Sequence, residues 1–418
     1  MRSKFSFARS LALALVAIGT VACVSSETFA ANRTWTASAS GTAGAKWGTA
    51  SIFAPNWSTP PSTNPTAADS AIFNAASART VSVIAGNTVP IGDINVTGAG
   101  NVTFGNSLNS KILISGNSAS PNIGLNLTSS GNAIFNGNVA VNAPQMTFRA
   151  TGSGVMTFGG GGLDLQGNYL KVVGNATQNS LGSTTAGATY EVVSGVQSLT
   201  FDSTNGVNVN VVVNGGIASG DGTGDSDLTV SGGTYLGGGT YKNVVSSAGA
   251  IDLTDGSTLE TTSFVQSAGG ELLANVNDDL SAGTVNGNYQ LGGAFTLDAN
   301  NLGTNLYSPG TSWSLFSGTN YTAGSPSPVN GSSNFSVFAM TNSSSSSPYF
   351  GTFTRFGQEW QSPFASDGTY LVFSAQTGNL VVVPEPSTMV FAGLGVAMSG
   401  WTMWKKRRLS KLLAAKAG

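Results

Sequence analysis

The sequence predicts an all-β protein: a right-handed parallel β-solenoid body, a C-terminal β-domain and a single C-terminal transmembrane helix. Three observations favour this fold class. Glycine accounts for 56 of 418 residues, short apolar runs alternate with polar residues, and no helical period exceeds two turns outside the termini. Such runs, bounded by Gly-Asn, Asn-Gly or Ser-Gly, are typical of strands joined by tight turns.

The solenoid is predicted to occupy residues 94–300. In such a coil each turn adds two or three short strands, inward apolar residues stack, and Asn and Gly occupy the corners. About ten turns spaced near 4.8 Å would form a rod of about 45–50 Å. Disorder is the competing interpretation, but disordered chains are depleted in Val, Ile, Leu and Phe. The predicted strands centre on Phe104, Phe135, Phe148, Phe158 and Phe201, at irregular spacing.

Residues 31–93 form a loop-rich stretch that contains Trp35, Trp47 and Trp57. We interpret it as an N-terminal cap, because clustered Trp side chains cover the open end of a solenoid core. Aromatic platforms also stack on sugar rings, so carbohydrate binding stays the alternative. Residues 301–383 are again rich in aromatics, on alternating strands. These aromatics are expected to be core residues of a β-domain rather than a ligand site.

Residues 1–30 have the layout of a secretory signal peptide. Three cations precede an apolar run over 11–24, and cleavage is expected between Ala30 and Ala31. The single cysteine, Cys23, lies inside this segment, and its lipidation is the alternative interpretation. After cleavage the chain would have no thiol for a disulfide, a metal or catalysis.

The segment 384–411 begins with Pro384, Glu385 and Pro386, the proposed recognition tripeptide. Residues 389–404 follow without a charge. As a helix, such a run spans about 24–27 Å, enough for a thin bilayer. Cations after an apolar helix stay on the cytoplasmic side and stop transfer. Here they are Lys405, Lys406, Arg407 and Arg408.

This order of tripeptide, apolar helix and basic tail resembles the PEP-CTERM sorting signal of Gram-negative bacteria. The resemblance implies that a membrane-embedded exosortase is the partner. It also implies inner-membrane anchoring before processing, followed by transfer to the cell surface or an exopolysaccharide matrix. An ordinary single-pass anchor is the alternative.

The body also carries a resemblance. Its tryptophans, followed by Ala71-Ile72-Phe73 and by the run TVSV at 80–83, are similar to the first turns of autotransporter-associated β-strand repeat proteins. The similarity covers about residues 35–160. It implies the same solenoid architecture that the alternating runs predict.

Charge and composition exclude several functions. The body from 31 to 384 has eight Lys and Arg against 17 Asp and Glu, a net charge of −9. Nucleic acid is therefore not an expected partner, because its binding depends on Lys and Arg that neutralise phosphates. The chain has no histidine, which excludes a Ser-His-Asp triad and imidazole metal ligands.

One acidic loop, GDGTGDSD, is a candidate metal site. Asp221, Asp225 and Asp227 stand close together among glycines, and Ca²⁺ binds several oxygens on a turning backbone. The loop lacks the spacing of an EF-hand, so a solvated corner loop is the alternative. No other cofactor is expected.

Two functional hypotheses follow. The first is a non-catalytic surface or matrix protein associated with exopolysaccharide. The alternative is a polysaccharide-active β-helix enzyme, a lyase or hydrolase that uses Asp carboxylates and Ca²⁺ with Arg149 or Arg355. An enzyme needs a cation beside its carboxylates, and no cation stands between Lys171 and Lys242. We therefore expect no enzymatic activity.

Overall fold

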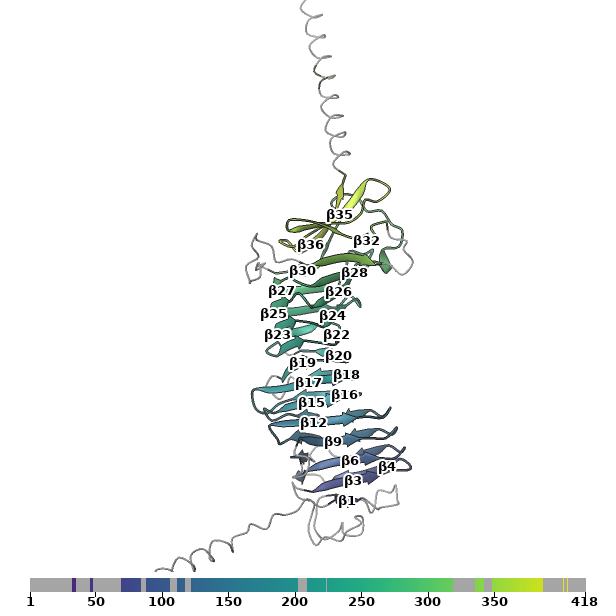
Figure 1. Cartoon of the computed structure of the whole chain (residues 1–418), viewed down its shortest axis with the longest axis vertical. Helices are drawn as coiled ribbons and strands as arrows, with labels where there is room; N and C mark the ends of the chain where they lie inside the picture. The colour runs from purple at the N-terminus through teal and green to yellow at the C-terminus, as the bar shows by residue number, and fades with distance from the viewer. Residues whose placement is uncertain are drawn as a thin grey trace, which may run out of the picture.

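The computed structural model describes residues 32–34, 46–47, 69–83, 88–105, 111–116, 122–201, 209–222, 224–318, 335–341 and 348–385, together with 401 and 404. Over these residues strands coil around one long axis, and the coil ends in a small antiparallel sheet (Figure 1). The predicted all-β, parallel solenoid is thereby confirmed. Its right-handed sense stays a prediction.

One side of the coil is a 13-stranded parallel sheet. Neighbouring strands belong to successive turns, whose length varies: 23 residues separate the paired Ser70 and Asp93, but only 16 separate Asp227 and Asn243. The strands are β1 (Asn32–Thr34), β3 (Ser70–Asn74), β6 (Asp93–Thr97), β9 (Ile123–Leu127), β12 (Gln145–Ala150), β15 (Tyr169–Val173), β17 (Ala188–Ser194), β19 (Val209–Val213), β21 (Asp227–Val230), β23 (Gly239–Ser246), β25 (Thr258–Gln266), β27 (Thr284–Gln290) and β30 (Phe316–Ser317).

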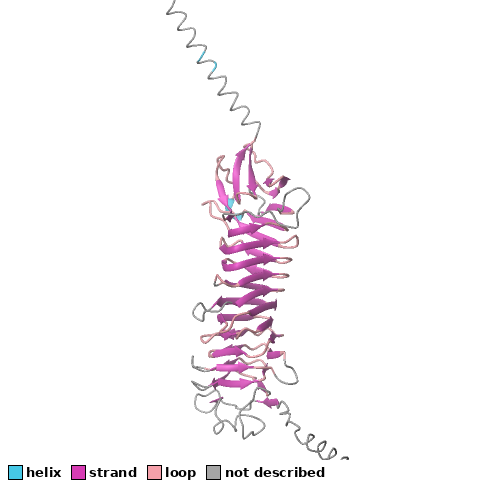
Figure 2. Cartoon of the chain, turned by 90° about the vertical axis from the view of Figure 1, so that its left-hand side faces the viewer, coloured by secondary structure: helices cyan, strands magenta, loops and turns pink. Residues whose placement is uncertain are grey.

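The opposite side is an 18-stranded sheet. Its first part consists of two parallel ladders, β4–β7–β10–β13 and β5–β8–β11–β14, and both end on β16. Among the described residues, the four turns that begin with β3, β6, β9 and β12 therefore have three strands each, and the turns from β15 to β28 have two. Figure 2 shows the strands of successive turns stacked along the coil. The strands are β2 (Lys46–Trp47), β4 (Arg79–Val83), β5 (Thr88–Ile91), β7 (Val102–Phe104), β8 (Lys111–Ile114), β10 (Ala133–Phe135), β11 (Asn138–Val141), β13 (Met156–Phe158), β14 (Leu163–Asp164), β16 (Ala176–Gly182), β18 (Val196–Phe201), β20 (Ile217–Asp221), β22 (Thr234–Leu236), β24 (Ala250–Leu253), β26 (Glu271–Asn275), β28 (Ala294–Asp298), β31 (Val337–Thr341) and β32 (Gly351–Thr352).

The core lies between the sheets and is filled by every second residue of each strand. Phe104, Phe135 and Phe158 occupy one register position on successive turns. Their rings stack nearly parallel, with centroids 4.7 and 5.0 Å apart. This distance matches the spacing of about 4.8 Å between paired strands, so identical residues in register stack directly.

Asparagine also recurs between turns. Asn126 Nδ2–H donates to Asn95 Oδ1 at 3.2 Å across β6 and β9. At a corner, Asn101 Oδ1 accepts the Asn132 N–H, and Asn132 Oδ1 accepts the Val155 N–H, both at 2.9 Å. The amide side chains therefore link successive turns both within a strand ladder and at a corner.

The solenoid extends beyond the predicted range 94–300 at both ends. Strands β3, β4 and β5 already belong to its sheets, and β30 and β31 continue them. The expectation of a separate cap over 31–93 was wrong for these strands, because Ala71 and Phe73 are buried core residues. Trp47 ends β2, which pairs with β4. Trp35 and Trp57 lie outside the described residues, so their capping or sugar-binding role stays a prediction.

A five-stranded antiparallel sheet follows the coil. Trp313 is fully buried, and its indole Nε1–H donates to the Asn277 carbonyl at 2.9 Å. Trp360 and Phe373 are buried too, so the interpretation of these three as core residues is confirmed. It was wrong for Phe350, Phe356 and Phe364, whose side chains are exposed. A single 3₁₀ turn, η2 (Asn300–Leu302), leads into this region. The strands are β29 (Ser312–Ser314), β33 (Thr354–Phe356), β34 (Glu359–Gln361), β35 (Thr369–Ser374) and β36 (Asn379–Pro384).

Candidate functional site

The predicted recognition tripeptide starts inside the folded domain. Pro384 is the last residue of β36 and is paired with Thr369 of β35. Proline suits this strand end because it has no N–H to donate to the ladder. The Glu385 N–H then donates to the Gly368 carbonyl at 2.7 Å. The tripeptide therefore begins within the antiparallel sheet, and no spacer separates the two.

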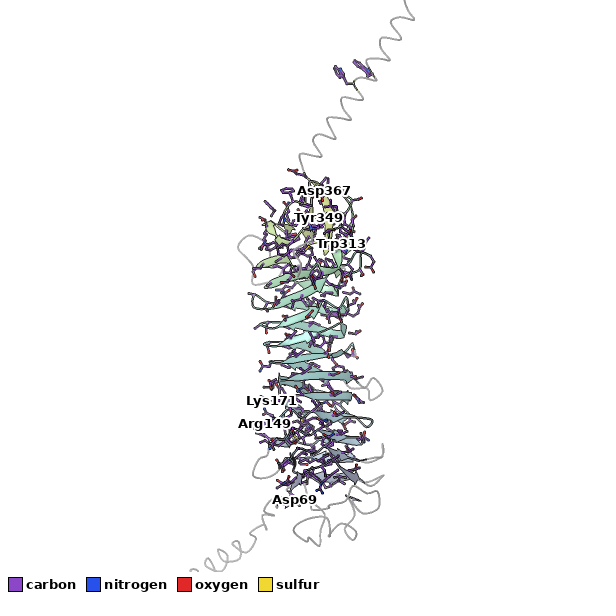
Figure 3. All side chains as sticks on the ribbon, turned by 90° about the vertical axis from the view of Figure 1, so that its right-hand side faces the viewer. Asp69, Arg149, Lys171, Trp313, Tyr349 and Asp367 are labelled. Atoms are coloured by element: carbon purple, nitrogen blue, oxygen red, sulfur yellow. The ribbon has the colours of Figure 1, made fainter. Side chains whose placement is uncertain are left out.

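A tight turn over 365–369 holds this start. The Ala365 N–H donates to the Thr369 carbonyl at 2.7 Å, and the Gly368 N–H to the Ala365 carbonyl at 3.1 Å. Asp367 Oδ1 accepts the Thr369 N–H at 2.9 Å. Figure 3 labels Asp367 at the C-terminal end of the coil. The turn thus fixes the Gly368 carbonyl that binds Glu385.

The remaining predicted sorting residues lie outside the described ones: Pro386, Lys405, Lys406, Arg407, Arg408, Ala30 and Ala31. So does most of the predicted transmembrane helix over 389–404. Trp401 and Trp404 are helical and exposed, with ring centroids 5.7 Å apart. No helix among the described residues is both long and apolar enough to span a membrane.

The acidic loop lies between β20 and β21. Asp221 ends β20, Asp225 is exposed in the turn, and Asp227 begins β21. Asp227 Oδ1 accepts an N–H of the Asn243 amide at 2.8 Å. In the described part of the chain, which leaves out the Asp221 side chain, no group of three acidic, His or Cys residues could hold a metal. Calcium binding at this loop stays a prediction.

The fold also brings a lysine to this loop. The Lys242 N–H, on the next turn of the coil, donates to the Ser226 carbonyl at 2.8 Å, and the Lys242 side chain is exposed. Spacing along the sequence had suggested that no cation is near. The sequence did not reveal the proximity of Lys242, because one short turn of the coil places residues that are 16 apart in register with each other.

Six aspartates share one structural role. Each carboxylate accepts the backbone N–H two residues further on, at 2.8–3.0 Å. This Asx geometry stabilises tight turns. At Asp279, hydrogen bonds from the Ser281 hydroxyl and N–H lower the pKa of the carboxyl. The six are Asp164, Asp252, Asp255, Asp279, Asp298 and Asp367.

Glu191 on β17 is a buried carboxylate with three partners. It accepts hydrogen bonds from the Tyr169 hydroxyl at 2.7 Å and the Asn214 amide at 3.0 Å, and lies 3.4 Å from Lys171 Nζ. Burial by itself raises the pKa of Glu191, but these hydrogen bonds and the lysine charge outweigh it, so the pKa lies below its usual value. Burial and Glu191 together raise the pKa of Tyr169 to about 12.

The two arginines considered for catalysis lie in different sheets. Arg149 is exposed on β12, opposite Val173 of β15. Arg355 lies on β33, where its guanidinium is 5.9 Å from the Trp360 ring centroid. In the 13-stranded sheet, β15, β17 and β19 separate β12 from β21 of the acidic loop. Arg149 and Arg355 therefore do not form one site with each other. Arg149 also does not lie beside the acidic loop.

Comparison with known proteins gave one match, the PEP-CTERM protein-sorting motif over residues 382–408. No curated protein and no solved structure matched the chain. The motif implies an exported protein that is anchored in the membrane and then sorted to the surface by an exosortase. It begins in β36, at Val382, and includes the tripeptide and all four cations. Residues 382–408 of this β-solenoid protein are therefore a PEP-CTERM protein-sorting motif.

Proposed function

We propose that the chain is a non-catalytic rod of the cell surface or extracellular matrix, associated with exopolysaccharide. One observation carries this proposal: a single core runs from Ala71 to Val382, where the sorting motif begins. Twelve steps of about 4.8 Å across the 13-stranded sheet correspond to about 58 Å of rod. Sorting at one end of this rod would leave its whole flank to contact other matrix components.

The outer face of the 13-stranded sheet supports association with a polymer. One half-buried residue with a hydrogen-bonding side chain stands at the same register position on each turn from β17 to β27. Hydroxyl and amide groups both donate and accept hydrogen bonds, as sugar hydroxyls do. The column therefore offers repeated contacts along the rod: Thr189, Asn210, Asp227, Asn243, Ser263 and Asn288.

The use of the carboxylates supports a structural role. Six aspartates close Asx turns, and Glu191 binds Tyr169, Asn214 and Lys171. A general acid or base must reach a substrate proton, whereas these groups already serve the backbone or a neighbouring side chain.

The test is co-sedimentation of the full chain, expressed and exported in an exosortase-bearing Gram-negative host, with exopolysaccharide extracted from that host. We expect the protein to pellet with the polysaccharide and to release neither reducing nor unsaturated ends. Turnover of the polysaccharide, or a protein that stays in the supernatant, would contradict the proposal.

Sorting is tested by fractionation of the same host. Glu385→Ala is expected to keep the protein in the inner-membrane fraction, as deletion of the exosortase should. Glu359→Ala changes an exposed glutamate of the same sheet and is the matched control, expected to reach the surface normally.

A further inference from the structure

A polar hollow of about 190 Å³ lies on the flank of the coil, where the two ladders of the 18-stranded sheet merge. Strands β8, β11, β14 and β16 and the turn after β16 surround it. Its principal lining residues are Lys111, Asn138, Gly162, Asp164, Ser180 and Thr184.

A glycine occupies one position of the residue column that lines the hollow. Register places Lys111 beside Asn138, and on the next two turns Gly162 and Ser180 continue the column. Gly162 has φ +77°, and a Cβ there would lie 2.5 Å from the Ser180 carbonyl oxygen. The backbone thus requires glycine at this position. Its bare surface separates the Asn138 and Ser180 side chains by about two strand spacings of about 4.8 Å each.

An ion pair crosses this gap. Lys111 Nζ on β8 reaches Asp164 Oδ2 on β14 at 3.3 Å, past the intervening strand β11. Both side chains stay accessible, at 31% and 20% exposure. A lysine ammonium has three N–H donors, and Asp164 is its one hydrogen-bond acceptor among the described residues. Two donors of Lys111 therefore remain for a ligand.

Further polar residues line the same space. The Thr184 hydroxyl lies 3.2 Å from both oxygens of Asp164, and Thr184 itself is exposed. The Ser180 hydroxyl and the Asn138 amide lie on the column beside Gly162. The hollow thus combines an ammonium, a carboxylate, an amide and two hydroxyls within one small volume.

This combination selects a neutral polyhydroxylated ring. Asp164 disfavours an anion and Lys111 disfavours a cation, whereas neutral sugar hydroxyls can accept from the remaining donors of Lys111 and bind the exposed Thr184 hydroxyl. The volume equals that of about six water molecules at about 30 Å³ each, and lies below the roughly 300 Å³ typical of sites for drug-sized ligands. It therefore suits one pyranose ring rather than an oligosaccharide.

We propose that this hollow binds a single neutral sugar residue at a chain end or side branch of the exopolysaccharide. The inference rests on the proposed function and adds to it the ligand class and the residues. The rod would then hold the polymer at a defined point near its N-terminal half, in addition to contacts along its outer sheet.

Saturation-transfer NMR on the detergent-solubilised full chain tests this site. The probes are the methyl glycosides of glucose, galactose and mannose, with methyl glucuronoside as the anionic comparison. We expect saturation transfer to at least one neutral glycoside, with a Kd in the millimolar range, and weaker transfer to the glucuronoside. Lys111→Met and Thr184→Phe should each raise the Kd at least fivefold, the first by removing donors and the second by filling the hollow.

Lys171→Met is the matched control. Lys171 also pairs with a carboxylate, that of Glu191, but Lys171 does not line the hollow. All three variants should keep the circular dichroism spectrum of the parent chain. The absence of transfer to every glycoside, or an unchanged Kd in a folded Lys111→Met protein, would overturn the inference. If that folded variant still pellets with exopolysaccharide, the matrix function stands and only this site fails.

Discussion

At the scale of single residues, glycine serves this fold for two separable reasons. Gly98 and Gly187 have nearly the same left-handed backbone, with φ of +90° and +89°. A Cβ at Gly98 would lie 2.5 Å from the Ala75 carbonyl oxygen on the preceding turn, whereas a Cβ at Gly187 would meet nothing within 4 Å. Conformation alone requires glycine at Gly187, and close approach of the preceding turn adds a second requirement at Gly98.

This difference predicts unequal costs for one substitution. Gly187→Ala should lower the free energy of unfolding by about 1–2 kcal/mol, the strain of a left-handed alanine. Gly98→Ala should cost about 1–3 kcal/mol more, because the methyl group also overpacks against backbone. Urea denaturation of both variants measures the difference. Equal losses would show that neighbouring turns do not press on Gly98.

At the scale of elements, pairing between strands places charged groups that lie far apart in sequence. Lys171 and Glu191 are direct register partners across β15 and β17. Tyr169 lies on the same strand as Lys171 and donates to Glu191. The cluster thus joins two successive turns through side chains as well as through the backbone ladder.

The cluster makes stability depend on pH. Because the pKa of Glu191 is lowered in the folded state from its ordinary value of 4.5, its contribution is present above that value and is lost as pH falls through the folded pKa. Glu191→Gln should therefore flatten the acid decline of the melting temperature as pH falls below about 5. Glu359→Gln, at an exposed position, is the control. A wild-type decline in Glu191→Gln would contradict this assignment.

At the scale of the whole molecule, the rod is nearly one-dimensional. Each turn contacts the turns before and after it, so stability is a sum of local and nearest-neighbour contributions. The stacked phenylalanines join β7, β10 and β13. A separate aromatic cluster joins the coil to the antiparallel sheet, where the ring of Phe373 lies 6.1 Å from Phe295 and 5.3 Å from Phe338. A destabilising substitution in one turn should therefore affect that turn and its neighbours, and leave distant turns unchanged.

Phe135→Ala tests this locality. Removing a buried ring from the stack should cost about 3–5 kcal/mol, and hydrogen exchange read by mass spectrometry should accelerate over about residues 102–164. Exchange over 250–298 should stay as in the parent chain. Phe356→Ala, at a side chain that is 56% exposed, is the control and should leave both regions unchanged. Uniform acceleration along the rod would show that the molecule unfolds as one unit.

The sequence by itself determined the features that depend on neighbouring residues. Alternation with period two predicted the strands, turn dipeptides predicted their ends, and the order of tripeptide, apolar run and cations predicted the sorting motif. The phenylalanines at 104, 135 and 158 were correctly placed on strands, but each is the last residue of its strand rather than the centre. Nothing in their spacing showed that they stack.

Only the tertiary structure decided which residues meet across turns. Turn length varies from 16 residues between Asp227 and Asn243 to 43 between Ala294 and Val337, so no fixed period relates a residue to its partner. For this reason the approach of Lys242 to the acidic loop, the partners of Glu191 and the gap at Gly162 were not predictable from the sequence. The predicted solenoid boundaries at 94 and 300 were wrong because they followed changes in composition. Stacking of turns requires only inward apolar residues in register, and these continue beyond both boundaries.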